Sequence, residues 1–144
     1  MKVRDLLNAM LIGSNNDTAK ALAGYISQKT NTKFVDLMNE SANSLSMSSS
    51  RYNNPIGFDS NTNYSSVEDM AILVQALLPS NVFDQTSKKS SYSFESKDGK
   101  PFTTSATNKL IDKYPDLFAI KTGFTNTALG SMVNLVKHND KTYL

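Results

Sequence analysis

Residues 117–123 read Leu-Phe-Ala-Ile-Lys-Thr-Gly, a short apolar run that ends in the tripeptide Lys121-Thr122-Gly123. A short apolar run bounded by glycine is typical of a strand. Near the other end of the chain, Ser14-Asn15-Asn16 follows an apolar stretch with helical spacing. Together the two segments offer a cation, hydroxyls and amides at the ends of regular elements, which is what a polar cleft needs.

The first half of the chain has the spacing of amphipathic helices. Val3, Leu6, Leu7, Met10 and Leu11 fall on one helical face, and Gly13 is expected to close that helix in the left-handed conformation. Three further helices are predicted. One follows the capping stretch Ser14–Asp17 and has an apolar face from Ala19 to Ile26, and one is capped by Thr30 or Asn31 and carries Phe34 to Leu45. The last runs from a capping box at Ser65-x-x-Glu68 to Pro79, and its buried face is expected to carry Val67, Met70, Ala71, Val74, Leu77 and Leu78.

The second half has the period of strands. Tyr92 and Phe94 alternate with serines, Asp98-Gly99 is the signal of a tight hairpin turn, and residues 102–104 return as the partner strand. Further strands are predicted at 119–121 and 130–137, and residues 142–144 begin another after a turn at 138–141. The chain therefore reads as helices followed by antiparallel strands.

Composition excludes several classes of function. A chain of 144 residues with 39% hydrophobic and 19% charged residues is globular and long enough for one core. The net charge of +2 is small and the lysines are scattered, which argues against a nucleic-acid partner. There is no cysteine, and neither the single histidine nor the acidic residues form a ligand set, so we expect no metal and no other cofactor.

No apolar stretch is long enough to span a bilayer, and no signal-peptide core follows Met1. This pattern indicates either a cytoplasmic protein or a chain whose natural N-terminus lies further upstream.

Lys121-Thr122-Gly123 has the chemistry of a substrate clamp. An extended peptide can pair with an exposed edge strand, the lysine adds positive potential, the threonine hydroxyl donates to a carboxylate, and the glycine allows close approach. Ser14 would relay a proton to a leaving amine, and the Asn16 amide would hold a substrate carbonyl. Taken singly, each motif has a plain structural alternative: a strand that enters a turn, and a helix cap.

The chain contains no Ser-x-x-Lys element, since every lysine has a residue other than serine three positions before it. His138 is the single histidine and is expected to be a solvated loop residue rather than part of a Ser-His-Asp arrangement. The side chains therefore amount to most of a serine hydrolase cleft without its nucleophile.

Four landmarks follow one another along nearly the whole chain. They are Ser-x-Asn after an apolar helix, Asn54-Pro55-Ile56-Gly57, the helix start at 65–71, and Lys-Thr-Gly within 120–125. In this order they resemble the serine-type D-Ala-D-Ala carboxypeptidases, the low-molecular-mass penicillin-binding proteins. The ordered set is more specific than any one motif.

The resemblance implies an α+β fold of the β-lactamase/transpeptidase kind, in which a helical region packs beside an antiparallel sheet that is incomplete here. Residues 1–80 would form the helical region with Ser-x-Asn, and residues 81–144 part of the sheet region with Lys-Thr-Gly, together within one catalytic domain. The implied activity is trimming of the D-Ala-D-Ala end of peptidoglycan stem peptides through an acyl-serine, which β-lactams trap. The implied location is the bacterial cell envelope, with export and any membrane association due to segments outside this chain.

The resemblance also implies a role for each matching position. These roles are a proton-relay hydroxyl at Ser14, a ligand of the substrate carbonyl at Asn16, binding of the terminal carboxylate region by Lys121 and Thr122, close approach at Gly123, and an oxyanion donor in the backbone N–H of Phe124.

Three departures from the family pattern matter. The Ser-x-x-Lys element would lie upstream of Met1, the chain stops one strand into its last hairpin, and Ile56 stands where the family usually has histidine. We therefore expect a truncated member that is catalytically silent alone and is marginally stable or associates through its exposed edge. The alternatives are a non-catalytic module that binds peptidoglycan peptides, and a relative of β-lactamases or endopeptidases that shares the cleft.

Overall fold

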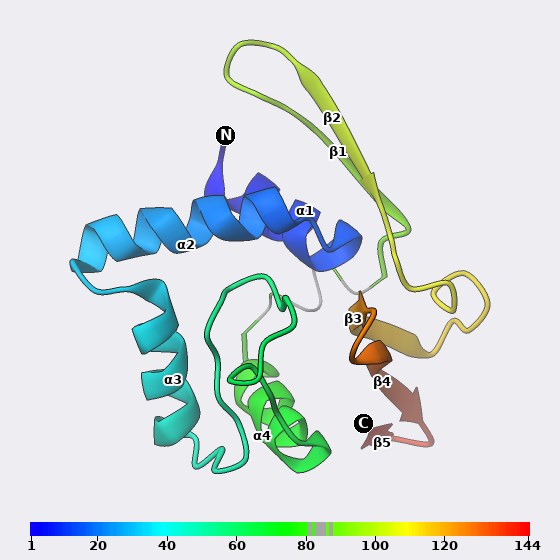
Figure 1. Ribbon diagram of the computed structural model, residues 1–144. Coiled ribbons are helices and arrows are strands. Elements are labelled where there is room, and N and C mark those ends of the chain that lie inside the picture. The colour runs from blue at the N-terminus through cyan, green and yellow to red at the C-terminus, as the bar shows by residue number, and fades with distance from the viewer. Residues whose placement is uncertain (81, 83–85, 87) are drawn as a thin grey trace. The chain divides into compact units, whose positions relative to one another are not determined.

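The computed structural model describes residues 1–80, 82, 86 and 88–144 (Figure 1). The elements follow in the order α1 (Val3–Gly13), α2 (Asn16–Thr30), α3 (Phe34–Ser44), α4 (Val67–Leu77), β1 (Ser91–Glu95), β2 (Pro101–Ser105), β3 (Leu117–Thr125), β4 (Leu129–His138) and β5 (Lys141–Tyr143). The predicted succession of helices and then strands is confirmed.

The chain divides into two compact units. The first unit joins Met1–Thr18 to Asn81–Leu144, and the second unit is Ala19–Ser80. Helix α1 therefore clusters with the strands and not with the other helices. A division into a helical region 1–80 and a sheet region 81–144 remains a prediction about the longer catalytic domain.

In the first unit, β1 and β2 form an antiparallel hairpin that extends beyond α1 (Figure 1). Gly99 follows Asp98 at a φ of 78°, in the left-handed region that glycine tolerates, and its N–H donates to Ser96 O at 3.0 Å. The Asp-Gly hairpin is thereby confirmed. The rings of Tyr92, Phe94 and Phe102 stack in a column along one face, as the alternation of aromatic residues with serines suggests.

The second sheet of the first unit has the strand order β3-β4-β5, all antiparallel. Strand β3 is longer than the three residues predicted, so Lys121-Thr122-Gly123 lies inside the strand and not at its end. The residues Asn139 and Asp140 join β4 to β5 with φ values of 48° and 59°. Two successive positive φ values match the right-handed twist of the strands that they connect.

The end of α1 differs from the prediction. Gly13 is still helical, and Ser14 takes the left-handed conformation with φ 52° and ψ 37°. Gly13 is required for another reason, because a Cβ at this position would lie 1.7 Å from Thr104 Oγ1. Glycine here allows α1 to approach β2 closely.

In the second unit, the start of α3 also differs from the prediction. Neither Thr30 nor Asn31 caps the helix; instead the backbone N–H of Phe34 donates to Ser27 Oγ at 2.8 Å, across the turn that joins α2 to α3. A hydroxyl seven positions upstream serves as the acceptor because the turn brings it back to the helix end.

Helix α4 is capped one residue later than its capping box predicts. Ser66 accepts a hydrogen bond from the backbone N–H of Asp69 at 3.1 Å, while Ser65 pairs with Ser50 at 2.6 Å. The Asp69 carboxylate is buried and accepts from Ser49 N at 2.8 Å and from Ser50 Oγ at 2.6 Å. Asp69 therefore ties the start of α4 to the loop before it, and the exposed Glu68 does not.

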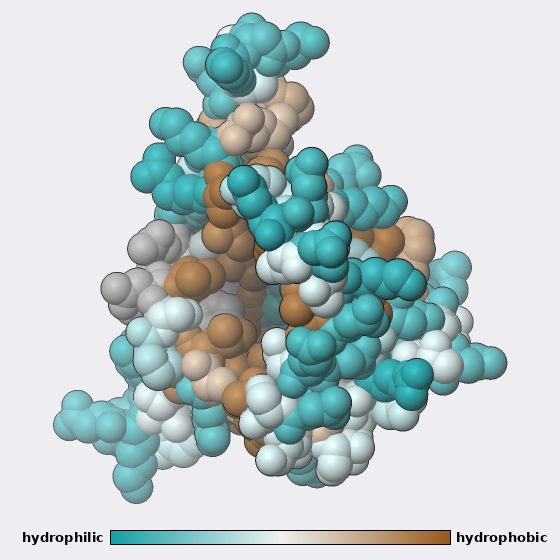
Figure 2. Space-filling view, turned by 90° about the vertical axis from the view of Figure 1, so that its left-hand side faces the viewer, coloured by the Kyte–Doolittle hydropathy of each residue, from teal (hydrophilic) through white to brown (hydrophobic). Residues whose placement is uncertain are grey.

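Burial is limited in both units. The core residues are Ala9, Ile12, Leu117, Ile120 and Leu135 in the first unit, and Ala19, Leu22, Ala23, Ala42, Met47 and Val74 in the second. The prediction that α4 buries its whole apolar face is wrong, since Val67 is 84% exposed and Leu77 and Leu78 are exposed as well. Helical spacing identifies an apolar face, but burial also needs an element to cover it. Apolar side chains accordingly reach the surface between polar ones (Figure 2).

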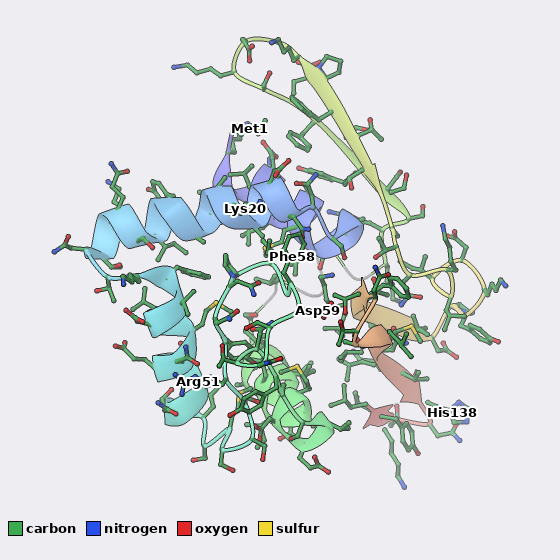
Figure 3. All side chains as sticks on the ribbon, in the orientation of Figure 1. Met1, Lys20, Arg51, Phe58, Asp59 and His138 are labelled. Atoms are coloured by element: carbon green, nitrogen blue, oxygen red, sulfur yellow. The ribbon has the colours of Figure 1, made fainter. Side chains whose placement is uncertain are left out.

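The predicted turn cluster at residues 53–57 is confirmed and extends into a loop closed by asparagines. Asn54 Oδ1 accepts from the backbone N–H groups of Ile56 and Phe58, at 3.2 and 3.0 Å. Phe58 remains exposed in this loop, beside Asp59 (Figure 3). Within the described residues, no helix is both long and apolar enough to cross a bilayer.

Candidate functional site

The end of α1 and the middle of β3 meet in the first unit. Lys121 Nζ donates to Ser14 Oγ and, at 2.5 Å, to the backbone carbonyl of Thr122. Ser14 Oγ lies 3.4 Å from that same carbonyl oxygen, to which it donates. The side chains of Ser14 and Lys121, which the sequence analysis selected from opposite ends of the chain, are thus in direct contact.

Two backbone irregularities place these side chains. Ser14 leaves the helix in the left-handed conformation, a single-residue departure seen at many helix ends. In β3 the pairing with β4 shifts register between Ala119 and Lys121, so Ile120 is an extra, bulged residue. Bulges re-aim the side chains that follow them. Ile120 is buried, and Lys121 reaches Ser14.

Lys121 is a desolvated cation. Burial lowers the pKa of its ammonium group below the ordinary value of 10.5. Among the described residues, no carboxylate lies within salt-bridge distance of Lys121 Nζ. Its positive potential is therefore not cancelled by a neighbouring acid and is available to an incoming anion.

The hydroxyl of Thr122 has a partner that the sequence analysis missed. Thr107 Oγ1 lies 2.5 Å from Thr122 Oγ1, and the backbone N–H of Thr107 donates to Ile12 O at 3.2 Å. Thr107 therefore bridges the last turn of α1 and β3. It lies in a polar loop segment without periodicity, so no local pattern singles it out.

Asn16 lies in the first turn of α2 with its side chain exposed, and its amide makes no hydrogen bond to any residue that the structure describes. Its neighbour Asn15 caps the helix, with Asn15 Oδ1 accepting from the backbone N–H of Thr18 at 2.9 Å. Within the predicted capping stretch, Asn15 alone is thus used as the cap. The Ser14 hydroxyl and the Asn16 amide are left for other partners.

Gly123 and Phe124 follow on β3. A Cβ on Gly123 would lie 2.9 Å from Ser131 Oγ on β4, and the Phe124 side chain is 73% exposed. Strand β3 is an outer strand of its sheet, with β4 on one side and no other described strand beside it. The edge that carries Lys121-Thr122-Gly123 can therefore pair with an extended peptide.

Buried polar groups hold this part of the first unit in place. Asn108 is 6% exposed and donates to Asn134 Oδ1 on β4 at 2.7 Å, which fixes the loop that carries Thr107. Asp5 in α1 is also buried and accepts from the Tyr92 hydroxyl at 2.8 Å, a bond that raises the pKa of Tyr92. Sequence reasoning found neither pair, because each joins residues that are distant along the chain.

His138 is exposed, as expected, but it is the last residue of β4 and not part of the turn (Figure 3). Its side chain takes part in none of the site contacts described above. No group of histidine and acidic side chains in the described part of the chain is arranged to hold a metal ion.

Comparison with known proteins identifies a family that matches nearly the whole chain. The model of the family described as "D-alanyl-D-alanine carboxypeptidase" matches residues 1–143. The D-alanyl-D-alanine carboxypeptidase DacF of Bacillus subtilis is 36% identical over 129 residues, which are 89% of this chain and 33% of that protein. The chain thus spans about a third of the length of this relative.

Two solved structures are similar over 99% of this chain. The Streptomyces K15 DD-transpeptidase has a TM-score of 0.87 at 24% identity, with 58% of its own chain covered, and shares the fold. Penicillin-binding protein D2 of Listeria monocytogenes, in a cefotaxime-bound form, has a TM-score of 0.81 at 27% identity, with 56% of its chain covered. The expected α+β transpeptidase-like fold is confirmed.

Proposed function

Because the chain belongs to the D-alanyl-D-alanine carboxypeptidase family, we propose that it supplies the proton-relay and carboxylate-binding part of a serine-type D-Ala-D-Ala carboxypeptidase. The complete enzyme hydrolyses the terminal peptide bond of peptidoglycan stem peptides. A serine attacks the carbonyl, D-alanine leaves, and water releases the acyl group from the serine. The nucleophile and its lysine base are absent from these 144 residues.

The contact of Lys121 with Ser14 and with the Thr122 carbonyl supports this proposal more than any other observation. Lys121 holds the Ser14 hydroxyl, which passes a proton to the leaving amine. The ammonium group also attracts the terminal carboxylate, with the Thr122 hydroxyl as a second donor. A cation without a carboxylate beside it among the described residues suits a substrate that brings its own negative charge.

The remaining roles use the edge of β3 and the start of α2. The substrate backbone pairs with β3, where Gly123 leaves room and the backbone N–H of Phe124 donates to the developing oxyanion. The free amide of Asn16 binds the substrate carbonyl. The cefotaxime-bound relative supports β-lactams as inhibitors of the whole enzyme, and the family supports the cell envelope as its location.

Labelled penicillin and intact-mass spectrometry test the proposal. The protein is produced from its native locus, and in parallel as the 144-residue chain. A single adduct on a polypeptide longer than 144 residues, with none on the chain alone, is the expected result, because the acylated serine lies outside this chain. A native product that begins at Met1 and takes up no penicillin would contradict the catalytic reading and favour a module that binds the peptide without cleaving it.

A further inference from the structure

The pair formed by Thr107 and Thr122 has a consequence for ligand recognition. Their hydroxyl oxygens are 2.5 Å apart, so one hydroxyl donates to the other. A hydroxyl carries a single proton. If Thr122 donates to Thr107, it can only accept from a ligand, and if it accepts from Thr107, its proton points to the ligand.

The surroundings favour one direction. Lys121 Nζ lies beside Thr122, bonded to the Thr122 carbonyl, and draws an anion toward this residue. A carboxylate only accepts hydrogen bonds, so Thr122 must offer its proton when a carboxylate is bound. The lone pair of Thr122 is then free to accept the proton of Thr107. Hydrogen bonds in such a chain polarise and strengthen one another.

Thr107 is held where it can do this. Its backbone N–H is bonded to Ile12 O in the last turn of α1, and the next residue, Asn108, is buried and bonded to Asn134 on β4. Both anchors are independent of the Thr107 side chain. Loss of the hydroxyl therefore leaves the loop in place while it removes the donor to Thr122.

We propose that Thr107 is a positioning residue that donates to the Thr122 hydroxyl, turns the Thr122 proton toward the ligand and so favours ligands with a free terminal carboxylate. This inference rests on the proposed function, since it assumes that a D-Ala-D-Ala carboxylate binds at Lys121 and Thr122. Thr107 does not touch the ligand itself. It acts on specificity, because Thr122 can accept an N–H of an amide end only if the hydrogen bond between the two threonines reverses.

The test is ligand binding by the 144-residue chain. The probes are N-acyl-D-Ala-D-Ala with a free carboxylate and the same peptide with a C-terminal amide, titrated into isotopically labelled protein and followed by the backbone NMR signals of β3. In Thr107→Val we expect the carboxylate peptide to bind about fivefold more weakly, the effect of one lost hydrogen bond, with the amide peptide unchanged. Thr107→Ser retains the hydroxyl and should keep the preference of the native chain.

Thr103→Val is the matched control. Thr103 and Ser93 form another hydroxyl pair, 2.9 Å apart, on the exposed surface of the β1–β2 hairpin. This variant should leave both affinities as they are. Thr107→Ala gives the same measurement if the valine variant does not fold.

The outcomes separate this inference from the proposed function. A carboxylate preference that survives in Thr107→Val, or an equal loss for the two peptides, would overturn the role of Thr107 alone. No binding of either peptide by the native chain would overturn this inference together with the idea that the β3 edge binds the peptide. A penicillin adduct on the longer protein would still support its catalytic activity.

Discussion

The two units differ in how far along the chain their polar contacts reach. In the first unit, Lys121 and Ser14 are 107 positions apart, and Ser14 and Thr122 are 108 apart. In the second unit, Asp69 binds Ser49, 20 positions away, and the asparagine loop closes on itself within a few residues. Polar contacts of the second unit are local and mainly structural, whereas those of the first bring the candidate site together.

The largest effect should come from Gly13 in the first unit, with Gly24 in the second unit as the matched position. Gly13→Ala places a Cβ 1.7 Å from Thr104 Oγ1 and 3.1 Å from Thr104 Cβ, so rotation of the threonine can move Oγ1 away but leaves the close contact with its Cβ. We expect a loss of about 3 kcal/mol in the free energy of unfolding, from overpacking between α1 and β2. Urea unfolding followed by circular dichroism measures it.

Gly24→Ala is the matched change in the second unit. Nothing lies within 4 Å of a Cβ at this position in the interior of α2. We expect a gain of about 0.5–1 kcal/mol from helix propensity. If the two substitutions had the same sign, the close approach of α1 to β2 would not be what requires Gly13.

The next effect distinguishes the two acidic residues at the start of α4. Asp69→Ala leaves Ser49 N and Ser50 Oγ without their buried acceptor and should cost about 2 kcal/mol. Glu68→Ala, one position earlier and exposed, should change the free energy of unfolding by less than about 0.5 kcal/mol. Thermal melts of the two variants decide whether α4 is tied down by Asp69 or by the capping box that the sequence suggests.

A smaller effect separates Asn15 from Asn16. Asn15→Ala removes the cap of α2 and should cost about 1 kcal/mol, without a direct effect on peptide binding. Asn16→Ala should leave stability within about 0.5 kcal/mol of the native chain, because its amide makes no hydrogen bond to any described residue, and should weaken D-Ala-D-Ala binding. The opposite assignment, with Asn16 essential to stability, would remove it from the site.

The smallest effect is the pH dependence of stability due to Lys121. Its pKa is lower in the folded state, so the cost of burying the ammonium group is fully present at neutral pH. As pH rises from the lowered pKa toward 10.5, the folded state loses the proton first and stability increases. Relative to Lys121→Met, the native chain should therefore gain stability across this window. A difference between the two urea midpoints that does not change with pH would show that Lys121 is not desolvated.

Peptide affinity should change in the opposite direction over the same range. The carboxylate is attracted by the charged form of Lys121, so binding weakens as pH rises through the lowered pKa. Stability and binding thus depend on the same proton with opposite signs, which is expected of a group placed for function.

Several features of the fold followed from short sequence patterns. Helical spacing identified α1 to α4, Asp98-Gly99 identified the β1–β2 hairpin, and the run at 117–123 identified part of β3, because each pattern reports a preference of neighbouring residues. The predictions were wrong where packing, and not the local sequence, decided which of several neighbouring residues takes a given role. Examples are Ser66 rather than Ser65 as the cap of α4, Ser14 rather than Gly13 in the left-handed conformation, and the exposed apolar face of α4.

For the candidate site, the residue types and their order along the chain came from the sequence: Ser-x-Asn first, Lys-Thr-Gly last, and no Ser-x-x-Lys between them. The tertiary structure alone decided that Lys121 contacts Ser14, that a bulge at Ile120 precedes it, and that Thr107 pairs with Thr122. The physical reason is that local preferences extend over a few residues, whereas contacts between positions 107 apart exist only once α1 and β3 are packed together.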